Sequence, residues 1–137
     1  MDKDLLELIP QREPIIMVHH VVSAKETGFE TNFTIKEDNI FLKGNILQEP
    51  ALIENIAQSA AAGFGTVAKK NGGEKGGLGF IGSVSRLKCH KLPKIGDTIN
   101  TKVEVGTKFG AITLIIAKNY VDGELLLECE MKIVTGV

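Results

Sequence analysis

Three polar residues interrupt an otherwise apolar stretch of the sequence, and they are the residues best placed to do chemistry. Glu54, Asn55 and Gln58 lie within residues 49–71, EPALIENIAQSAAAGFGTVAKKN. Burial of a carboxyl group raises its pKa, which suits a general acid. Gln58 follows Glu54 by one helical turn and is spaced to orient it. We predict Glu54 and Gln58 as catalytic residues, and we expect Asn55 to face solvent or a dimer contact. The alternative is that Glu54 is an ordinary solvated glutamate.

The apolar residues of the same stretch recur at the spacing of one helical face. They are Leu52, Ile53, Ile56, Ala60, Phe64 and Val67. Pro50 suits a first helical turn, where a missing N–H costs nothing. Lys69 and Lys70 bring positive charge to the negative end of the helix dipole, and Asn71 suits the stop. The pattern predicts one helix of about 20 residues, roughly 30 Å long.

The rest of the chain has the composition and alternation of β-strands. The predicted strands cover residues 15–24, 29–35, 80–91, 98–107, 111–121 and 124–134. Residues 36–48 form an apolar loop, and residues 72–79 a glycine-rich connection. Two strands, a long helix and a four-stranded meander favour an antiparallel sheet wrapped around the helix. The alternative is an α+β domain whose helix lies on a flatter sheet.

Length and composition narrow the class of protein. A chain of 137 residues predicts one domain over residues 1–137. A net charge of −1 implies no bulk attraction to nucleic acid. No apolar run approaches the length of a membrane span or a signal peptide. Cys89 and Cys129 are too few for a disulfide framework, lack metal-ligand spacing, and are expected to be packed thiols. We predict a cytoplasmic protein without metal or other cofactor.

Three pieces of the sequence, in this order, carry a resemblance to a known family. The first is IPQREPIIMVHHV at residues 9–21, and the second is LIENIAQSAAA at residues 52–62. The third, residues 79–97, opens with Gly-Phe-Ile-Gly and closes with Pro-x-x-Gly-Asp. Together they resemble the hotdog-fold β-hydroxyacyl-(acyl carrier protein) dehydratases of fatty acid synthesis over nearly the whole chain. The likeness is greatest to dehydratase-like proteins of bacterial polyene and aryl-lipid pathways.

The resemblance implies both a fold and a mechanism. The fold is a curved antiparallel sheet of about five to six strands wrapped around one long central helix. In the family, a histidine removes a proton α to the thioester carbonyl, and an acid on the helix protonates the departing β-hydroxyl. Backbone N–H groups at the helix N-terminus polarise the carbonyl. The two side chains come from different subunits of a dimer. Glu54 matches the acid and Gln58 the glutamine that follows it.

The sequence departs from the family pattern at the residue that serves as the general base. The family places its histidine fourteen residues before the acid, in a His-Phe-Pro-Gly motif, where this chain has Ile40 and only Phe41 matches. An earlier family histidine is Gln11. Gln48 and Glu49 replace the family's Pro-Gly pair just before the helix, and a proline follows at Pro50. The negative charge of Glu49 and the missing N–H of Pro50 therefore disturb the position of the oxyanion. A positioned base typically contributes about 10²–10⁴-fold, so its loss matters most.

Three other histidines are candidates for the missing base. His19 and His20 are adjacent on a predicted strand and should therefore point to opposite faces. His90 lies near a predicted turn. The sequence places none of them beside Glu54, and the alternative is that all three are ordinary strand or surface residues.

These observations predict a hotdog homodimer, or a higher oligomer, that binds an acyl thioester on acyl carrier protein or coenzyme A. The residues predicted to line the acyl site, or simply to fill the core, are Phe41, Phe80, Ile81 and Gly82. A rim of basic side chains would face the carrier or would only be solvated: Arg12, Arg86, Lys88, Lys91 and Lys94. The first hypothesis is a 3-hydroxyacyl-(acyl carrier protein) dehydratase or a close relative. The alternatives are a thioesterase that uses Glu54, and a non-catalytic acyl-binding partner subunit.

Overall fold

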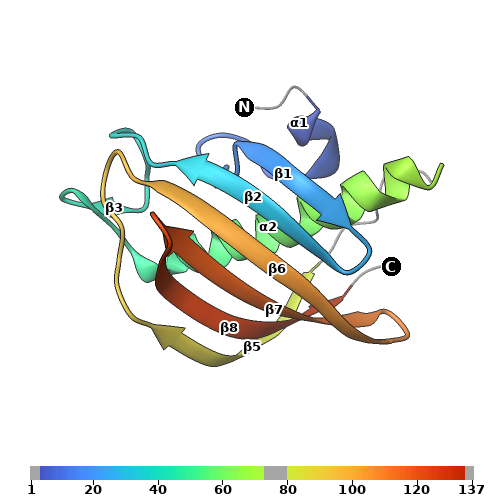
Figure 1. The fold of residues 1–137 in the computed structure, drawn as a ribbon. Coiled ribbons are helices and arrows are strands. Elements are labelled where there is room, and N and C mark those ends of the chain that lie inside the picture. Colours follow the sequence, from blue (N-terminus) through green and yellow to red (C-terminus); the bar gives the residue numbers. More distant parts are fainter. Residues whose placement is uncertain (1–3, 73–79, 135–137) are drawn as a thin grey trace.

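The long helix α2, Glu49–Lys70, runs across one face of a six-stranded antiparallel sheet that curves around it (Figure 1). The structure is a computed structural model and describes residues 4–72 and 80–134. The strands of the sheet are β1 (His20–Lys25), β2 (Gly28–Thr34), β5 (Phe80–Cys89), β6 (Thr98–Phe109), β7 (Ile112–Val121) and β8 (Glu124–Val134). Their order in the sheet is β1-β2-β6-β7-β8-β5. The predicted sheet wrapped around a helix is confirmed.

The helix α2 begins and ends close to its predicted bounds. Pro50 lies in its first turn, and Lys69 and Lys70 lie in its last turn. No side chain caps its N-terminus at Gln48. Leu52, Ile56 and Ala60 are fully buried. The helix therefore forms from its apolar face and its terminal charges, while its first turn depends on tertiary contacts for position.

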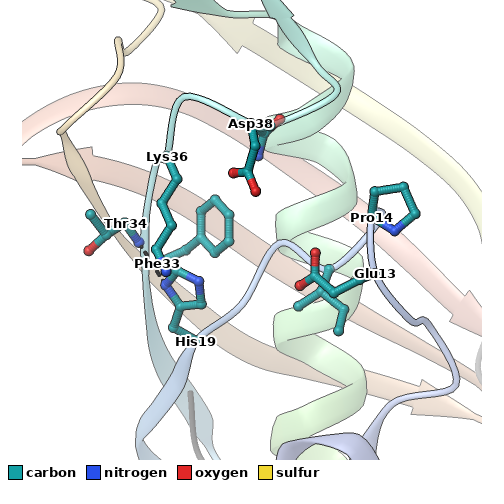
Figure 2. Close-up of a pocket in the computed structure, with 9 residues that line it drawn as sticks. Glu13, Pro14, His19, Phe33, Thr34, Lys36 and Asp38 are labelled. Atoms are coloured by element: carbon teal, nitrogen blue, oxygen red, sulfur yellow. Dashed lines mark hydrogen bonds between the residues drawn. The ribbon is translucent and has the colours of Figure 1, made fainter.

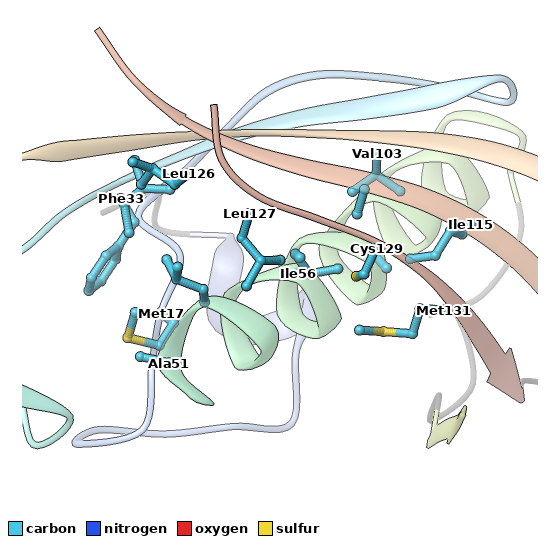
Figure 3. Close-up of a cluster of buried hydrophobic side chains, with 14 of the residues drawn as sticks. Met17, Phe33, Ala51, Ile56, Val103, Ile115, Leu126, Leu127, Cys129 and Met131 are labelled. Atoms are coloured by element: carbon cyan, nitrogen blue, oxygen red, sulfur yellow. The ribbon is translucent and has the colours of Figure 1, made fainter. Parts of the chain in front are cut away.

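The core lies between α2 and the inner face of the sheet, as Figure 3 shows. Alternation along β6 buries Ile99, Thr101 and Val103, and the last strand β8 contributes Leu127 and Met131. The helix packs mainly against β1, β2, β6 and β7. The edge strand β5, whose residues 81–90 are exposed, extends the sheet beyond this core.

The predicted strand over residues 15–24 is wrong in its first half. β1 begins only at His20, although the N–H of His19 still bonds to the carbonyl of Asn32 in β2 at 2.9 Å. Residues 15–17 belong to no strand, and Ile15 lies at a bend of the chain. Their β-branched and apolar side chains fit an extended backbone. The backbone polar groups bond instead to side chains of α2, a partner that strand propensity cannot predict.

The segment before α2 is packed only in part: its apolar composition predicts packing, but Ile40 and Ile46 are 51% and 39% exposed. It contains two short paired strands, β3 (Leu42–Lys43) and β4 (Ile46–Leu47). Phe41 and Leu42 pack against the core, and Leu47 is fully buried. The first element of the described chain is a short helix, α1 (Leu5–Leu8), which precedes β1.

Two further expectations of the sequence have different outcomes. The glycine-rich connection at residues 73–79 lies outside the described residues. Cys129 is buried as predicted, but Cys89 is exposed because β5 is an edge strand. Among the described residues, no helix combines the length and the apolar character that crossing a membrane requires.

Gly63 allows α2 to approach β2 closely, and its replacement tests that contact. A Cβ at Gly63 would overlap the ring of Phe29, which is itself buried. We expect Gly63→Ala to lower the free energy of unfolding by about 1–3 kcal/mol, because the core must shift. Gly65→Ala is the matched control, since its Cβ would meet only the mobile end of Leu8, at 2.9 Å. Urea unfolding of both variants checks this, and equal stabilities would contradict it.

Candidate functional site

Glu54 lies on a face of α2 that no other part of the described chain covers completely. Five half-exposed side chains form this face, here called the open stripe: Ile53, Glu54, Ala57, Ala61 and Phe64. Burial raises the pKa of Glu54 above its ordinary value, and the hydrogen bond from the Gln58 side chain offsets part of that rise. The carboxyl group therefore keeps its proton to a higher pH than a solvated glutamate does, as a general acid requires.

Gln58 is fully buried and holds the extended segment before β1 against the helix. Its Oε1 accepts a hydrogen bond from the N–H of Met17 at 2.7 Å. Its Nε2 donates to the carbonyl of Ile15 at 2.9 Å. A single amide side chain thus reproduces the pair of bonds that a neighbouring strand would make. Its predicted catalytic support of Glu54 stays a prediction beside this structural contact.

Asn55 lies in the core, so the expectation that it faces solvent or a dimer contact is wrong. Its side chain is fully buried. Its Nδ2 donates to the carbonyl of Met17 at 2.6 Å. Its Oδ1 accepts from the hydroxyl of Thr101 at 2.5 Å and from Nδ2 of Asn119 at 3.1 Å. The Asn119 amide also donates to the Thr101 hydroxyl at 2.8 Å.

The edge strand β5 leaves a second apolar surface uncovered. Within the described chain it pairs with β8 alone, and residues 81–90 are exposed. Ile81 pairs with Ile133, and Val84 with Met131. Because Ile133 and Met131 belong to the core, Ile81 and Val84 face the same side of the sheet as α2. The inner face of β5 is therefore apolar and open.

The residues predicted to line an acyl site lie in two different places. Phe41 precedes α2 and is half-buried against the core. Ile81 and Gly82 lie on β5, where Ile81 is 45% exposed. Phe80 begins the same strand, but its side chain is outside the described part. Their role in substrate binding stays a prediction.

The predicted basic rim is largely neutralised along β5. Arg86 forms an ion pair with Glu130 at 2.9 Å, and Lys91 forms one with Glu124 at 3.0 Å. Lys88 is paired in register with Glu128. Three cations of the rim thus face three carboxylates of the neighbouring strand, which weakens their attraction for an acidic partner.

His19 lines a separate cavity of about 590 Å³ (Figure 2). Its Nδ1 accepts a hydrogen bond from the N–H of Thr34 at 3.1 Å, and its ring packs 4.4 Å from that of Phe33. Burial, helped by the positive charge of Lys36, lowers the pKa of His19 to about 4. The imidazole is therefore neutral at pH 7 and carries its proton on Nε2. With Nδ1 occupied, it is a hydrogen-bond donor and a poor general base.

The other two histidines also lie apart from Glu54. His90 bonds to Glu128 through Nε2 at 3.0 Å on the outer face of the sheet. His20 is an exposed residue at the start of β1. No histidine of the described chain contributes to the pKa of Glu54. The structure brings Glu54 and Gln58 together, as predicted, and it adds Asn55 and Met17, but it adds no base.

Comparisons with known proteins agree on the fold and the family. The family model described as ApeP-like, ApeP dehydratase, matches residues 3–134. A 3-hydroxyacyl-(acyl-carrier-protein) dehydratase FabZ from Oceanobacillus iheyensis is 31% identical over 129 residues, which are 91% of each chain. The dehydratase heterocomplex ApeI:P from Xenorhabdus doucetiae contains a chain that matches with a TM-score of 0.88 at 14% identity, covering 97% of this chain and 91% of that one.

A second similar structure carries the name of a different activity. It is a hypothetical thioesterase protein with coenzyme A from Streptococcus pneumoniae, with a TM-score of 0.68 at 10% identity. The match covers 98% of this chain and 95% of that one. At this identity the likeness shows the fold alone. The hotdog fold predicted from the sequence is confirmed by these neighbours.

The low pKa of His19 predicts how stability depends on pH. The unfolded chain takes up the proton near 6.5 and the folded chain only near 4. The contribution of neutral His19 is therefore present above about pH 6.5 and is lost as the pH falls toward 4. We expect His19→Asn, which keeps an acceptor for Thr34, to flatten this decline in the free energy of unfolding. Urea unfolding across the range checks it with His20→Asn as control, and parallel curves for wild type and His19→Asn would contradict it.

Proposed function

Because the chain belongs to the ApeP-like dehydratase family, we propose that it acts on a β-hydroxyacyl thioester, with Glu54 as the acid of the dehydration. One observation carries this assignment. Glu54 is half-buried on the open stripe, and burial raises the pKa of its carboxyl group. The carboxyl group thus keeps its proton to a higher pH than a solvated glutamate does, on a face of the helix that a substrate can reach.

The proposed reaction removes water across the α and β carbons of the acyl chain. A base takes the α proton, and the electron pair of that C–H bond forms the new double bond. The β C–O bond breaks, and the Glu54 carboxyl gives its proton to the departing hydroxyl, so that water leaves. Glu54 ends as a carboxylate and the base ends protonated, and exchange with solvent restores both. Gln58, which donates to the Glu54 carboxyl, steadies the carboxylate that forms.

The base is the part of this reaction for which the described chain offers no candidate beside Glu54. His19 has an occupied Nδ1 and a low pKa, and His90 is paired with Glu128. We propose that a second chain supplies the base, either another copy of this one or a related dehydratase. The relative from Xenorhabdus doucetiae, described as part of a heterocomplex, supports the second possibility.

The proposed place of assembly is the open edge of β5. Ile81, Val84 and Leu87 are 45%, 36% and 37% exposed, which is unusual for large apolar side chains on one strand. Pairing with a second edge strand would satisfy the free backbone groups of β5 and extend the sheet. It would also bring a second chain toward the open stripe that carries Glu54.

The carrier and the compartment are part of the same proposal. Relatives named for acyl carrier protein support a substrate bound to that carrier. The similar structure with coenzyme A supports an acyl-coenzyme A thioester as the alternative. The acyl chain would lie against Phe41, Phe80, Ile81 and Gly82. The free thiols of Cys89 and Cys129 fit a reducing cytoplasm.

A thioesterase is the second candidate, and the missing base favours it. One carboxylate can activate water or attack a thioester directly, so this chemistry runs without a histidine. A third possibility is an acyl-binding subunit that only completes the site of a partner. The dehydratase and the thioesterase leave different products, and the binding subunit leaves none. One set of assays therefore separates the three possibilities.

Glu54→Gln tests the proposed acid. We expect dehydration of a β-hydroxyacyl thioester to fall by about 10²-fold or more, because glutamine has no proton to give at this position. Substrate binding should change little, since shape and size are kept. Glu37→Gln, an exposed glutamate before α2, is the matched control. Unchanged turnover in Glu54→Gln would contradict the assignment of the acid.

The same assay with saturated acyl thioesters decides between the alternatives. Water loss that depends on Glu54 supports the dehydratase. Release of free thiol supports the thioesterase, and binding without either product supports the non-catalytic subunit. The assay is run on the purified chain alone and again with a related dehydratase chain that contains the family histidine.

Val84→Lys tests assembly through β5. We expect sedimentation to show a mass near that of the 14.8 kDa chain for the variant and a multiple of it for wild type, because a lysine there would be buried without a partner. Ile112→Lys is the matched control, since Ile112 is 41% exposed on the outer face of β7. Assembly that survives Val84→Lys unchanged would exclude this edge.

A further inference from the structure

We propose that Asn55 is a positioning residue for Glu54: its buried hydrogen bonds fix the rotation of α2 about its own axis and thereby the direction of the Glu54 carboxyl group. Neighbouring residues of an α-helix lie about 100° apart around the axis. If Asn55 is held toward the sheet, Glu54 is held on the open stripe. The relation follows from helix geometry and does not require any contact between the two side chains.

The network of Asn55 joins three parts of the fold. The Met17 carbonyl belongs to the segment before β1, Thr101 to β6 and Asn119 to β7. Asn55, Thr101 and Asn119 are all fully buried. A buried amide or hydroxyl that loses its partner costs about 1–3 kcal/mol. Rotation of α2 would break several of these bonds together, so the network restricts the helix to one orientation.

The rest of α2 gives the helix less directional control near Glu54. Gln48 provides no side-chain cap, so the first turn is not fixed from its own end. The apolar contacts of Leu52 and Ile56 are non-directional and tolerate small rotations. Gly63 packs closely on Phe29, but it lies more than two turns beyond Glu54. The Asn55 network is therefore the directional contact nearest to the proposed acid.

Gln58 strengthens the same arrangement from the next turn on the same side of the helix. It bonds to the N–H of Met17, while Asn55 bonds to the carbonyl of the same residue. Met17 is thus held at both of its backbone polar groups by residues one turn apart. The segment and the helix form one unit, and Asn55 links that unit to the sheet. The consequence for turnover rests on the proposed function, whereas the consequence for the orientation of Glu54 does not.

The test replaces the whole polar network by apolar groups of similar shape. The variant Asn55→Leu with Thr101→Val and Asn119→Leu removes the three side-chain partners at once, so that of the groups in the network only the Met17 carbonyl is left without its donor. The milder Thr101→Val removes the two bonds of the Thr101 hydroxyl and leaves Asn119 bonded to Asn55. The matched control is Ser59→Ala with Thr31→Val, because Ser59 and Thr31 form a buried 2.7 Å bond between α2 and β2.

The first readout is a carbon NMR titration of the Glu54 carboxyl group, which needs no substrate. In wild type, burial raises the pKa of Glu54, and no charged side chain of the described residues contributes to the shift. We expect the triple variant to titrate closer to an ordinary glutamate and to show more than one carboxyl environment, because the helix can turn Glu54 toward water. Thr101→Val should move in the same direction by less, and the Ser59 control should match wild type.

The second readout is turnover. We expect kcat of the triple variant to fall on the order of 10²-fold with a smaller change in KM, as for a misplaced reacting group. If both network variants titrate like wild type, Asn55 is only structural and the proposal is overturned. If the triple variant does not fold, the comparison of the Thr101→Val titration with that of the Ser59 control decides the question. If wild type shows no dehydration, the titration still tests the positioning, and only the proposed function fails.

Discussion

The fold depends on one contact in which side chains of a helix take the place of a β-strand. Gln58 and Asn55 bond to the backbone of residues 15–17, which have no strand beside them. Buried backbone groups without partners would each cost about 1–3 kcal/mol, so these amides determine where the segment lies. Gln58 and Asn55 therefore have a structural role at the candidate site that does not depend on any part in the chemistry.

Because of this contact, the polar residues of α2 point to two different sides of the helix. The side of the helix that carries Asn55 is closed by the sheet and by residues 15–17, while the open stripe is left to whatever covers it from outside. The edge strand β5 extends past the helix with its own apolar face exposed. The chain thus has one complete core and one incomplete apolar surface, and its proposed acid lies on the open stripe of α2.

The helix and the sheet were predictable because their signals are local. Residues 49–70 carry a helical apolar period, and β6 and β8 alternate in the period of a strand. Asn55 could have been placed too, since it lies three residues after Leu52 and four before Ser59, both buried. The segment at residues 15–17 could not, because its partner lies about 40 residues away and is an amide side chain. The partial burial of Glu54 was predictable from its apolar neighbours. The occupied Nδ1 of His19 was not, because it depends on Thr34 of the adjoining strand.

The half-burial of Glu54 links the chemistry to assembly. In the single chain, burial already raises the pKa of its carboxyl group while one side of the helix remains open. A second chain laid over the open stripe would remove more water from the same carboxyl and raise that pKa further, since desolvation disfavours the charged form. A general acid works best when its pKa lies near the working pH. The same covering that would bring a base to the site would therefore also bring the acid closer to its useful protonation state, so an isolated chain would lack the base and would have a less effective acid.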